Sequence, residues 1–270
     1  MNQDHDILIS VRGLVAGYGD RRILRDISFD VRRGEVFVIV GGSGCGKSTL
    51  LKHMIGLYPP IAGEVWIDEQ NIVAAEGEAR DQLLRTFGVV YQSGALFGSM
   101  DVANNVMLPL NEFTQLPEDA KLQVALSKLE LVGLDEAAHR MPSELSGGMQ
   151  KRAAIARALA LDPTLLFLDE PSAGLDPVTS AGLDLLITEL SHYLGITFVI
   201  VTHDVPSINV IADHLIMLDS QTKSITAEGA PAELRLHSKD PAVRRFFDRQ
   251  PLPPQSAIGE KSYANQNERS

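Results

Sequence analysis

Cysteine is almost absent from this sequence, because the 270 residues include only one, Cys45. A single thiol cannot form a disulfide within the chain, and chains of this size without disulfides are typical of the cytosol. Long apolar runs are also missing: the most apolar stretches, residues 36–40 and 197–201, have the length of strands. A membrane-spanning helix needs about 20 apolar residues. We therefore expect any role at a membrane to depend on partner proteins.

The sequence also lacks an excess of basic residues. Lys and Arg total 24 against 35 Asp and Glu, which gives a formal net charge of -11. Dedicated nucleic-acid-binding proteins usually carry a basic total or a basic patch, so the balance argues against that class. The first residues are polar and acidic, with no basic segment leading into an apolar one, and they predict no secretory signal.

Short β-branched runs alternate with longer amphipathic stretches along the chain. Several runs are apolar on both faces, as strands are when helices cover both sides of a parallel sheet. The alternation predicts an α/β fold. Strands are expected at residues 7–11, 27–31, 36–40, 63–67, 88–91, 165–168, 197–201 and 214–218. Helices are expected at residues 47–55, 118–131, 147–160, 177–193 and 205–211.

The distribution of strand signals suggests how the chain is divided. Residues 93–161 lack strong strand signals, and we interpret them as a helical insertion between two strands of the main sheet. Residues 1–92 and 162–230 would form the core. Residues 231–250 would be a C-terminal extension, in which DPAVRRFFD (240–248) predicts a short amphipathic helix. Residues 251–270 are polar and proline-bearing and are predicted to be disordered.

A glycine-rich segment follows the strand expected at residues 36–40. It matches G-x-x-x-x-G-K-[ST], the pattern of a loop whose backbone N–H groups wrap phosphates at the positive end of a helix. Lys47 would reach the β- and γ-phosphates, Ser48 would bind Mg²⁺, and Thr49 would add a phosphate contact. The alternatives are a glycine-rich turn without a ligand and, for Cys45, a redox sensor rather than a small loop residue. The segment comprises Gly41, Gly42, Ser43, Gly44, Cys45, Gly46, Lys47, Ser48 and Thr49.

Polar side chains follow three of the expected strands. In TLLFLDEP, Asp169 and Glu170 end a buried strand, where Asp169 would hold Mg²⁺ and Glu170 would act as general base toward water. His203 and Gln92 follow two further strands, at the edge where open α/β sheets bind ligands. His203 would contact the γ-phosphate, and Gln92 would bind Mg²⁺ or the water. Taken singly, each of these groups is also consistent with a structural role.

LSGGMQKR, residues 145–152, resembles the signature motif of ABC ATPases. The order of the other motifs is similar to that family as well, including SAGLDP at residues 172–177, and the resemblance covers about residues 7–229. It implies a P-loop NTPase (RecA-like) core with an antiparallel β subdomain and an inserted α-helical subdomain. It also implies that Tyr18 stacks on adenine. Met149 stands where many members have glutamine, at a position that tolerates variation.

The resemblance implies that two copies pair head to tail, with each ATP and its Mg²⁺ between the phosphate loop of one copy and the signature of the other. Ser146, Gly147 and Gly148 would open a helix whose N–H groups face the γ-phosphate bound by the other copy. Asp176 would cross the interface. The alternative for the signature is a plain helix start capped by Ser146.

Three segments resemble more closely the ATPases of Mla-type and other MCE-protein lipid transporters: residues 92–110, 145–163 and 240–248. This resemblance implies a peripheral subunit on the cytoplasmic face of the inner membrane, powering phospholipid transport between inner and outer membranes. Its partners would be a membrane permease, an MCE-domain lipid-binding protein and a small accessory regulator. The alternatives are a polar-solute importer of the amino-acid type, or a soluble ABC ATPase acting on ribosomes or DNA. Transport direction, the lipid and the stoichiometry carry no sequence signal.

Two apolar segments lie outside the ATPase motifs. Residues 95–100 (ALFGSM) form an apolar patch directly after Gln92, where a cytoplasmic helix of a membrane partner would dock. Alternatively, Leu96 and Phe97 pack under the helical insertion, and both interpretations can hold. Phe246 and Phe247 would anchor the extension to its own domain or to a second subunit, and the resemblance favours the second subunit.

Overall fold

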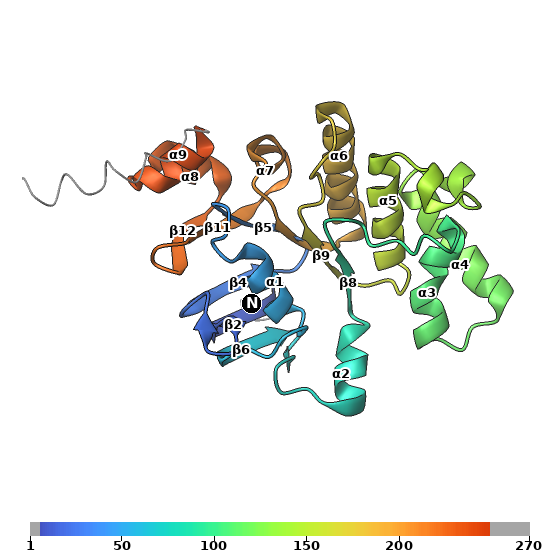
Figure 1. Cartoon of the computed structure of the whole chain (residues 1–270), viewed down its shortest axis with the longest axis horizontal. Coiled ribbons are helices and arrows are strands. Elements are labelled where there is room, and N and C mark those ends of the chain that lie inside the picture. Colours follow the sequence, from blue (N-terminus) through green and yellow to red (C-terminus); the bar gives the residue numbers. More distant parts are fainter. Residues whose placement is uncertain (1–5, 249–270) are drawn as a thin grey trace, which may run out of the picture.

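The computed structural model describes residues 6–248, and its centre is a six-stranded sheet (Figure 1). The strand order is β12-β11-β5-β10-β9-β8. The five strands from β11 to β8 are parallel, and β12 pairs with β11 in the antiparallel direction at one edge. The sequence predicted the parallel strands to within two residues but missed β12. The strands are β5 (Val36–Gly41), β8 (Phe87–Val90), β9 (Leu165–Asp169), β10 (Thr197–Val201), β11 (His214–Asp219) and β12 (Ser224–Gly229).

A second, antiparallel sheet lies against one face of the main sheet (Figure 1). Its strand order is β4-β1-β6-β7, and β1 is four residues longer than the sequence predicted. A two-stranded ribbon of β2 and β3 accompanies it. The strands are β1 (Ile7–Val15), β2 (Gly17–Tyr18), β3 (Arg21–Arg22), β4 (Ile27–Arg32), β6 (Ala62–Ile67) and β7 (Gln70–Asn71).

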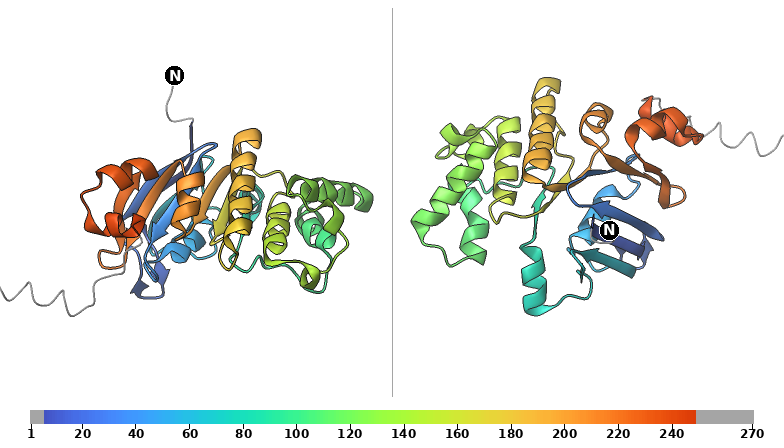
Figure 2. Two further views of the ribbon diagram at one scale, coloured as in Figure 1. Left: turned by 90° about the horizontal axis from the view of Figure 1, so that it is seen from above. Right: turned by 180° about the vertical axis from the view of Figure 1, so that it is seen from behind.

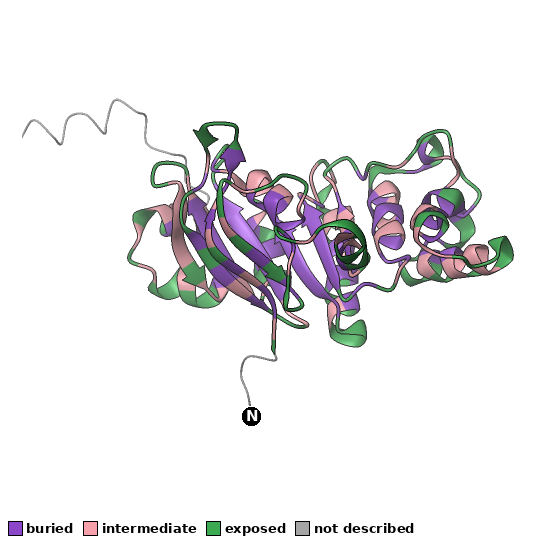
Figure 3. Cartoon of the chain, turned by 90° about the horizontal axis from the view of Figure 1, so that it is seen from below, coloured by how far each residue is buried: buried purple, intermediate pink, exposed green. Residues whose placement is uncertain are grey.

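The apolar runs of the main sheet are explained by two hydrophobic cores, one on each face (Figure 3). Successive side chains of a strand point to opposite faces. In β5, Val36, Val38 and Val40 therefore enter the core under the outer helices, while Phe37 and Ile39 enter the core against the antiparallel sheet. Because both faces of the sheet are covered, the ends of its strands are left for a ligand site.

The helices expected from the sequence are all present, with ends that differ by one or two residues. Three helices of residues 93–161 pack together at one end of the molecule (Figure 2). The short helix α2 and the first insertion helix, α3, were not predicted as separate elements. No helix among residues 6–248 is long and apolar enough to cross a membrane. The helices are α1 (Lys47–Met54), α2 (Gly77–Leu84), α3 (Val102–Phe113), α4 (Glu118–Leu131), α5 (Gly147–Ala158), α6 (Pro177–Leu194) and α7 (Val205–Ile211).

The C-terminal extension forms α8 (Pro231–His237) and α9 (Pro241–Phe247) at the opposite end of the main sheet (Figures 1 and 2). The helix α9 confirms the short helix expected at residues 240–248. It packs on its own chain, since Val243 and Phe247 are buried in the core under the outer helices. The predicted disorder of residues 251–270, and the last two residues of the extension, lie outside the described residues.

Candidate functional site

A pocket of about 940 Å³ lies at the carboxyl ends of the parallel strands. Open α/β sheets bind their ligands at this edge, because the loops there leave a crevice between the strands and the following helices. The pocket brings together the glycine-rich loop, three of the side chains predicted at strand ends, and residues from both termini of the fold. Its lining residues are Arg21, Ile23, Gly41, Gly42, Ser43, Gly44, Gly46, Lys47, Ser48, Thr49, Gln92, Glu170, His203, Asp204, Val205, Arg245 and Phe246.

Two glycines of the loop are required by its backbone. Gly41 has a φ of 149°, and a Cβ there would lie 2.5 Å from the carbonyl oxygen of Leu218. Gly46 has a φ of 108° and begins α1 without a side-chain cap. The first N–H groups of α1 therefore border the pocket at the positive end of the helix dipole, where an anion is favoured.

Lys47 and Cys45 take different positions in this loop. The Lys47 Nζ donates to the carbonyl oxygens of Gly41 and Gly42, at 2.9 and 3.2 Å, so the ammonium is held over the loop. Cys45 is 2% exposed and does not line the pocket. Burial raises the pKa of its thiol, which keeps the sulfur protonated. The position suits a small packing residue and not a reactive thiolate.

Asp169 and Ser48 meet beneath the loop. The Ser48 hydroxyl donates to Asp169 Oδ1 at 3.1 Å, and burial is the main cause that raises the pKa of the Asp169 carboxyl. Ser48 and Gln92 line the pocket, and these two side chains and Asp169 carry oxygen donors, the type that Mg²⁺ prefers. Residues 6–248 contain no group of three or more His, Cys, Asp and Glu that would hold a metal alone. Hydroxyl, carboxylate and amide oxygens suit an ion such as Mg²⁺, whose remaining positions are usually filled by phosphate and water.

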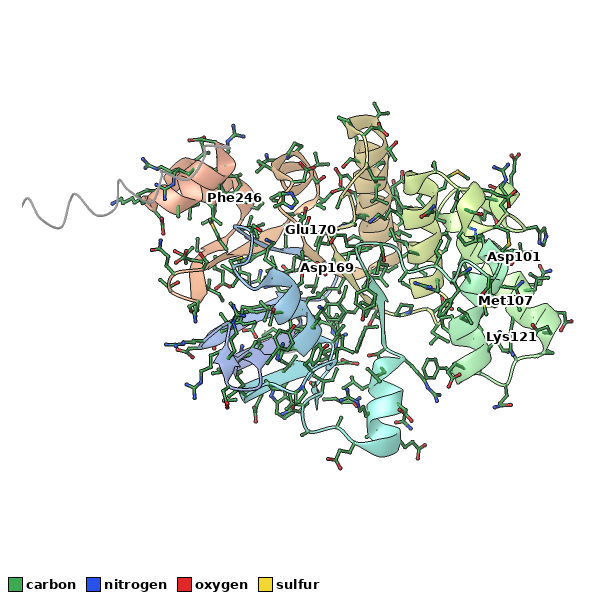
Figure 4. The ribbon with its side chains drawn as sticks, in the orientation of Figure 1. Asp101, Met107, Lys121, Asp169, Glu170 and Phe246 are labelled. Atoms are coloured by element: carbon green, nitrogen blue, oxygen red, sulfur yellow. The ribbon has the colours of Figure 1, made fainter. Side chains whose placement is uncertain are left out.

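Glu170 and His203 form a directed pair at this edge, where Figure 4 labels Asp169 and Glu170. The His203 Nδ1 lies 2.8 and 2.9 Å from the two carboxylate oxygens of Glu170. Glu170 has a φ of 49°, a conformation rare outside glycine and typical of strained functional positions. Its backbone N–H donates to the carbonyl oxygen of Val201 at 2.8 Å, which ties β9 to β10. The arrangement fixes a carboxylate able to accept a proton from water.

Gln92 is linked to the helical insertion by contacts that the sequence did not reveal. Lys151 on α5 is buried, which lowers the pKa of its ammonium, and it donates to the backbone carbonyl of Gln92. Arg157, two turns further along the same helix, donates to the carbonyl oxygens of Gly94 and Ala95 at 2.8 and 2.7 Å. The segment after β8 is thus tied to the helix that begins at the signature.

The apolar patch of residues 95–100 divides between its two interpretations. Leu96 is partly buried and packs against the core, whereas Phe97 is 55% exposed. The buried Asn105 of α3 accepts from the Phe97 N–H at 2.7 Å and donates to the Phe97 carbonyl at 3.1 Å. The patch is therefore a fixed loop that presents one aromatic ring to solvent.

Seven of the predicted residues do not line this pocket: Tyr18, Cys45, Ser146, Gly147, Gly148, Asp169 and Asp176. Tyr18 pairs with Arg21 across the β2–β3 ribbon and stands edge-on to Tyr58, with ring centroids 5.0 Å apart. Ser146 caps α5 by accepting from the Met149 N–H at 3.3 Å. Asp176 caps α6, and its hydrogen bond from the Thr179 hydroxyl lowers the pKa of its carboxyl. The signature and the Asp176 segment are thus helix starts outside the pocket of their own chain.

Six lining residues were missed by the sequence reading: Arg21, Ile23, Asp204, Val205, Arg245 and Phe246. Asp204 and Val205 directly follow His203, and this adjacency was a usable signal. Arg245 and Phe246 come from α9, and no local pattern links that helix to the glycine-rich loop.

Comparison with known proteins assigns this arrangement to a family. The family model described as "ABC transporter" matches residues 24–173, more than half of the chain. The chain belongs to the ABC transporter family. A similar relative of this ABC cassette is the "Intermembrane phospholipid transport system ATP-binding protein MlaF" of Escherichia coli (strain K12), 44% identical over 92% of this chain and 91% of the relative. Another is the "Probable ribonucleotide transport ATP-binding protein mkl" of Mycobacterium leprae, 40% identical over 94% of this chain and 73% of the relative.

Solved structures of other cassettes share the fold of this ABC cassette. The cbiO1 protein of Clostridium perfringens superposes with a TM-score of 0.78 at 30% identity, covering 95% of this chain and 99% of that chain. The ATP-binding cassette MJ0796, solved as a dimer bound to ADP and Pi, gives a TM-score of 0.74 at 29% identity, over 83% of this chain and 98% of that chain. The P-loop NTPase fold expected from the sequence is confirmed, and this cassette is an ATP-binding, ATP-hydrolysing subunit.

Proposed function

We propose that this ABC cassette powers phospholipid transport between the inner and outer membranes, as the ATPase subunit of an Mla-type complex. The observation that carries the proposal is the 44% identity to MlaF over 92% of this chain and 91% of the relative. That similarity extends well beyond residues 24–173, where the general family model matches. The same division of the chain then applies: a core of residues 1–92 and 162–230, a helical subdomain of residues 93–161, an extension of residues 231–250 and a tail of residues 251–270.

The glycine-rich loop binds the phosphates of ATP in this proposal. Its backbone N–H groups and the start of α1 surround the phosphate chain, and Lys47 turns from its loop carbonyls to the β- and γ-phosphate oxygens. Tyr18 stacks on the adenine. Ser48, Asp169 and Gln92 supply the protein oxygens for Mg²⁺. When bound, Mg²⁺ would neutralise charge on the phosphate oxygens.

Glu170 acts as the general base for hydrolysis. The water oxygen attacks the γ-phosphorus, its proton passes to the Glu170 carboxylate, and the bond from the γ-phosphorus to the ADP oxygen breaks. His203 holds the carboxylate through its Nδ1 at 2.8 Å, which leaves the opposite ring nitrogen available to the γ-phosphate. The pair therefore positions both the base and the group that it acts on.

The signature completes the site of a second copy. Ser146 and Gly147 are exposed at the start of α5, and their N–H groups are available to a γ-phosphate bound by another subunit. Asp176 lies at the exposed start of α6 and crosses the same interface. Two copies pair head to tail, and each pair of half-sites holds one ATP.

The remaining partners follow from the Mla-type assignment. A membrane permease contacts the loop that presents Phe97, which places the cassette on the cytoplasmic face of the inner membrane. An MCE-domain lipid-binding protein and a small accessory regulator join the complex. The extension of residues 231–250 reaches across the ATPase pair in addition to packing on its own core.

The assignment is tested by recovering the complex from native membranes in mild detergent and identifying its proteins and lipids by mass spectrometry. We expect a permease, an MCE-domain protein and phospholipid. Phe97→Glu should lose the permease, and Tyr193→Glu, which changes another exposed aromatic ring on α6, should retain it. Recovery of a solute-importer permease with a solute-binding protein would contradict the lipid assignment and leave the ATPase intact.

A further inference from the structure

The helix α9 of the C-terminal extension contributes two side chains, Arg245 and Phe246, to the wall of the pocket that also holds the glycine-rich loop and His203. Neither side chain has a part in the hydrolytic chemistry described above. Figure 4 labels Phe246 beside the helices of the extension and Glu170 at the main sheet. A segment remote in sequence thus borders this pocket.

The position of α9 is fixed by its packing on the same chain. Val243 and Phe247 are 0% and 7% exposed within the core that also contains residues of β11 and α7. The Asp240 carboxylate caps the helix by accepting from the Ala242 N–H at 2.7 Å, and its other oxygen accepts from the Thr226 hydroxyl of β12 at 2.9 Å. Arg245 and Phe246 therefore lie on a helix whose backbone is fixed on the core, and both side chains line the pocket.

The guanidinium of Arg245 is a poor match for a purely structural role. Its Nε is buried and makes no hydrogen bond within the described part of the chain. Buried side-chain donors are normally paired, and an arginine side chain is charged at every physiological pH. Phosphate oxygens offer both the acceptors and the opposite charge, and the planar fork of arginine suits two of them at once.

The pocket wall carries charges of both signs, and Arg21, Lys47 and Arg245 are its lysine and arginine side chains. Glu170 and Asp204 bring carboxylates to its wall, and the Lys47 ammonium is shared with the loop carbonyls. A triphosphate carries more negative charge than a diphosphate, so an additional cation favours ATP over ADP. Phe246 lies beside this cation and packs edge-on against Phe247, with centroids 5.4 Å apart, as an apolar wall for the contact.

We propose that Arg245 donates hydrogen bonds to the phosphate chain of the ATP bound in its own subunit. The C-terminal extension is then part of the nucleotide site, and α9 distinguishes ATP from ADP. This inference rests on the proposed role of the loop at residues 41–49, so its test includes a variant of that loop.

The test is calorimetric titration of the full chain with ATP and with ADP, in a Glu170→Gln background that prevents turnover. Arg245→Ala should weaken ATP binding about ten-fold and ADP binding less than about three-fold, the range for one charge-assisted contact. Arg245→Lys, which keeps the charge and loses the fork, should fall between. Arg244→Ala is the matched control, because Arg244 is exposed on the same helix and its Nε donates to the Ser238 carbonyl.

A second measurement keeps the test independent of any folding defect. Hydrogen exchange of the unsubstituted chain should show α9 amides better protected with ATP than with ADP. If Arg245→Ala bound ATP with unchanged affinity while Lys47→Ala lost binding, the inference about Arg245 would be overturned. The proposed role of the loop in phosphate binding would stand. If Lys47→Ala bound ATP with the affinity of the unsubstituted protein, the loop would not bind the phosphates, and the basis of the inference about Arg245 would be lost. A loss of dimer with unchanged affinity of the monomer would assign Arg245 to a subunit contact and would also overturn it.

Discussion

Two helix starts in this cassette, those of α1 and α5, both contain glycine but lie in different surroundings. The start of α1 at Gly46 lies in the pocket, where β9 and β10 bring Glu170 and His203 to meet it. The start of α5 at Ser146 is exposed, and no residue of the signature lines that pocket. The same local device, free N–H groups at the end of a helix dipole, is complete in one place and open in the other.

Under the proposed function, this contrast explains why one chain contains the motifs of a whole ATPase but only half of each ATP site. The sheet edge assembles the glycine-rich loop, Glu170 and His203, the residues to which the proposal assigns phosphate binding and hydrolysis. The insertion carries a second exposed helix start, that of α5, outside this pocket. The head-to-tail pair that we propose would bring the start of α5 of one copy to the pocket of the other.

The largest effect is expected from the base. Glu170→Gln keeps the size of the side chain and removes its ability to accept a proton, so ATP turnover should fall about 10³-fold while ATP binding persists. Phosphate release measured at saturating ATP checks this. If Glu170→Gln hydrolysed ATP at the rate of the unsubstituted protein, Glu170 would not be the base.

Removing the Lys47 ammonium should affect the pocket at the start of α1 and not the exposed start of α5. Lys47→Ala deletes the ammonium at Gly41 and Gly42 and should weaken ATP binding about 100-fold, as expected for loss of a charged contact to phosphate. The measurement is titration with a fluorescent ATP analogue. Ser146→Arg, which changes the open half, should leave the affinity of the monomer unchanged.

Gly148 allows α5 to pack closely against α6 near the exposed start of α5. A Cβ at this position would lie 2.3 Å from Cγ2 of Thr179, so Gly148→Ala forces α5 away from α6 and should destabilise the fold by about 2 kcal/mol. Thr179→Ser removes that methyl group and keeps the hydroxyl that bonds to Asp176. Chemical denaturation should show the double variant regaining most of the loss. A double variant as unstable as Gly148→Ala would place the constraint elsewhere.

The smallest effect concerns Asp184, a buried carboxyl in the helix that Asp176 begins. Burial raises its pKa, so its charged form destabilises the folded state at neutral pH. The Ser207 hydroxyl donates to Asp184 Oδ2 at 2.8 Å, and the amide of Asp184→Asn can still accept this hydrogen bond. The substitution should raise the free energy of unfolding by about 1 kcal/mol at pH 7. The gain should shrink as pH falls through the raised pKa of Asp184 and vanish below the unfolded value of about 3.9.

Thermal unfolding across pH measures this difference. The exposed Asp135→Asn is the control and should show little change at any pH. A gain for Asp184→Asn that stayed constant down to acidic pH would rule out desolvation of the carboxylate as its cause.

The parts of the fold that could be predicted are those whose residues carry their own signal. The strand β5 is apolar on both faces because both faces are covered, and the glycines of the loop are imposed by its backbone. The edge strand β12 escaped because it has no buried residue and so shows no apolar run. The helix α3 contains Pro109, which obscures a helical pattern.

The sequence predicted many of the residues that line the pocket but not the contacts among them. The bond from His203 to both oxygens of Glu170 depends on a left-handed backbone at Glu170, which is not encoded by any local preference of glutamate. The ammonium of Lys151 on Gln92 and the position of Arg245 depend on how distant helices fold back over the sheet. Such contacts arise from tertiary packing and leave no periodic pattern in the sequence.

The most direct test of the two complementary halves is sedimentation velocity of Glu170→Gln with ATP, with and without Ser146→Arg. We expect Glu170→Gln to form a dimer when ATP is present, and the double variant to remain a monomer that binds ATP with unchanged affinity. Equal dimerisation of the two proteins would contradict the account, because the signature would then have no part in holding ATP between two copies.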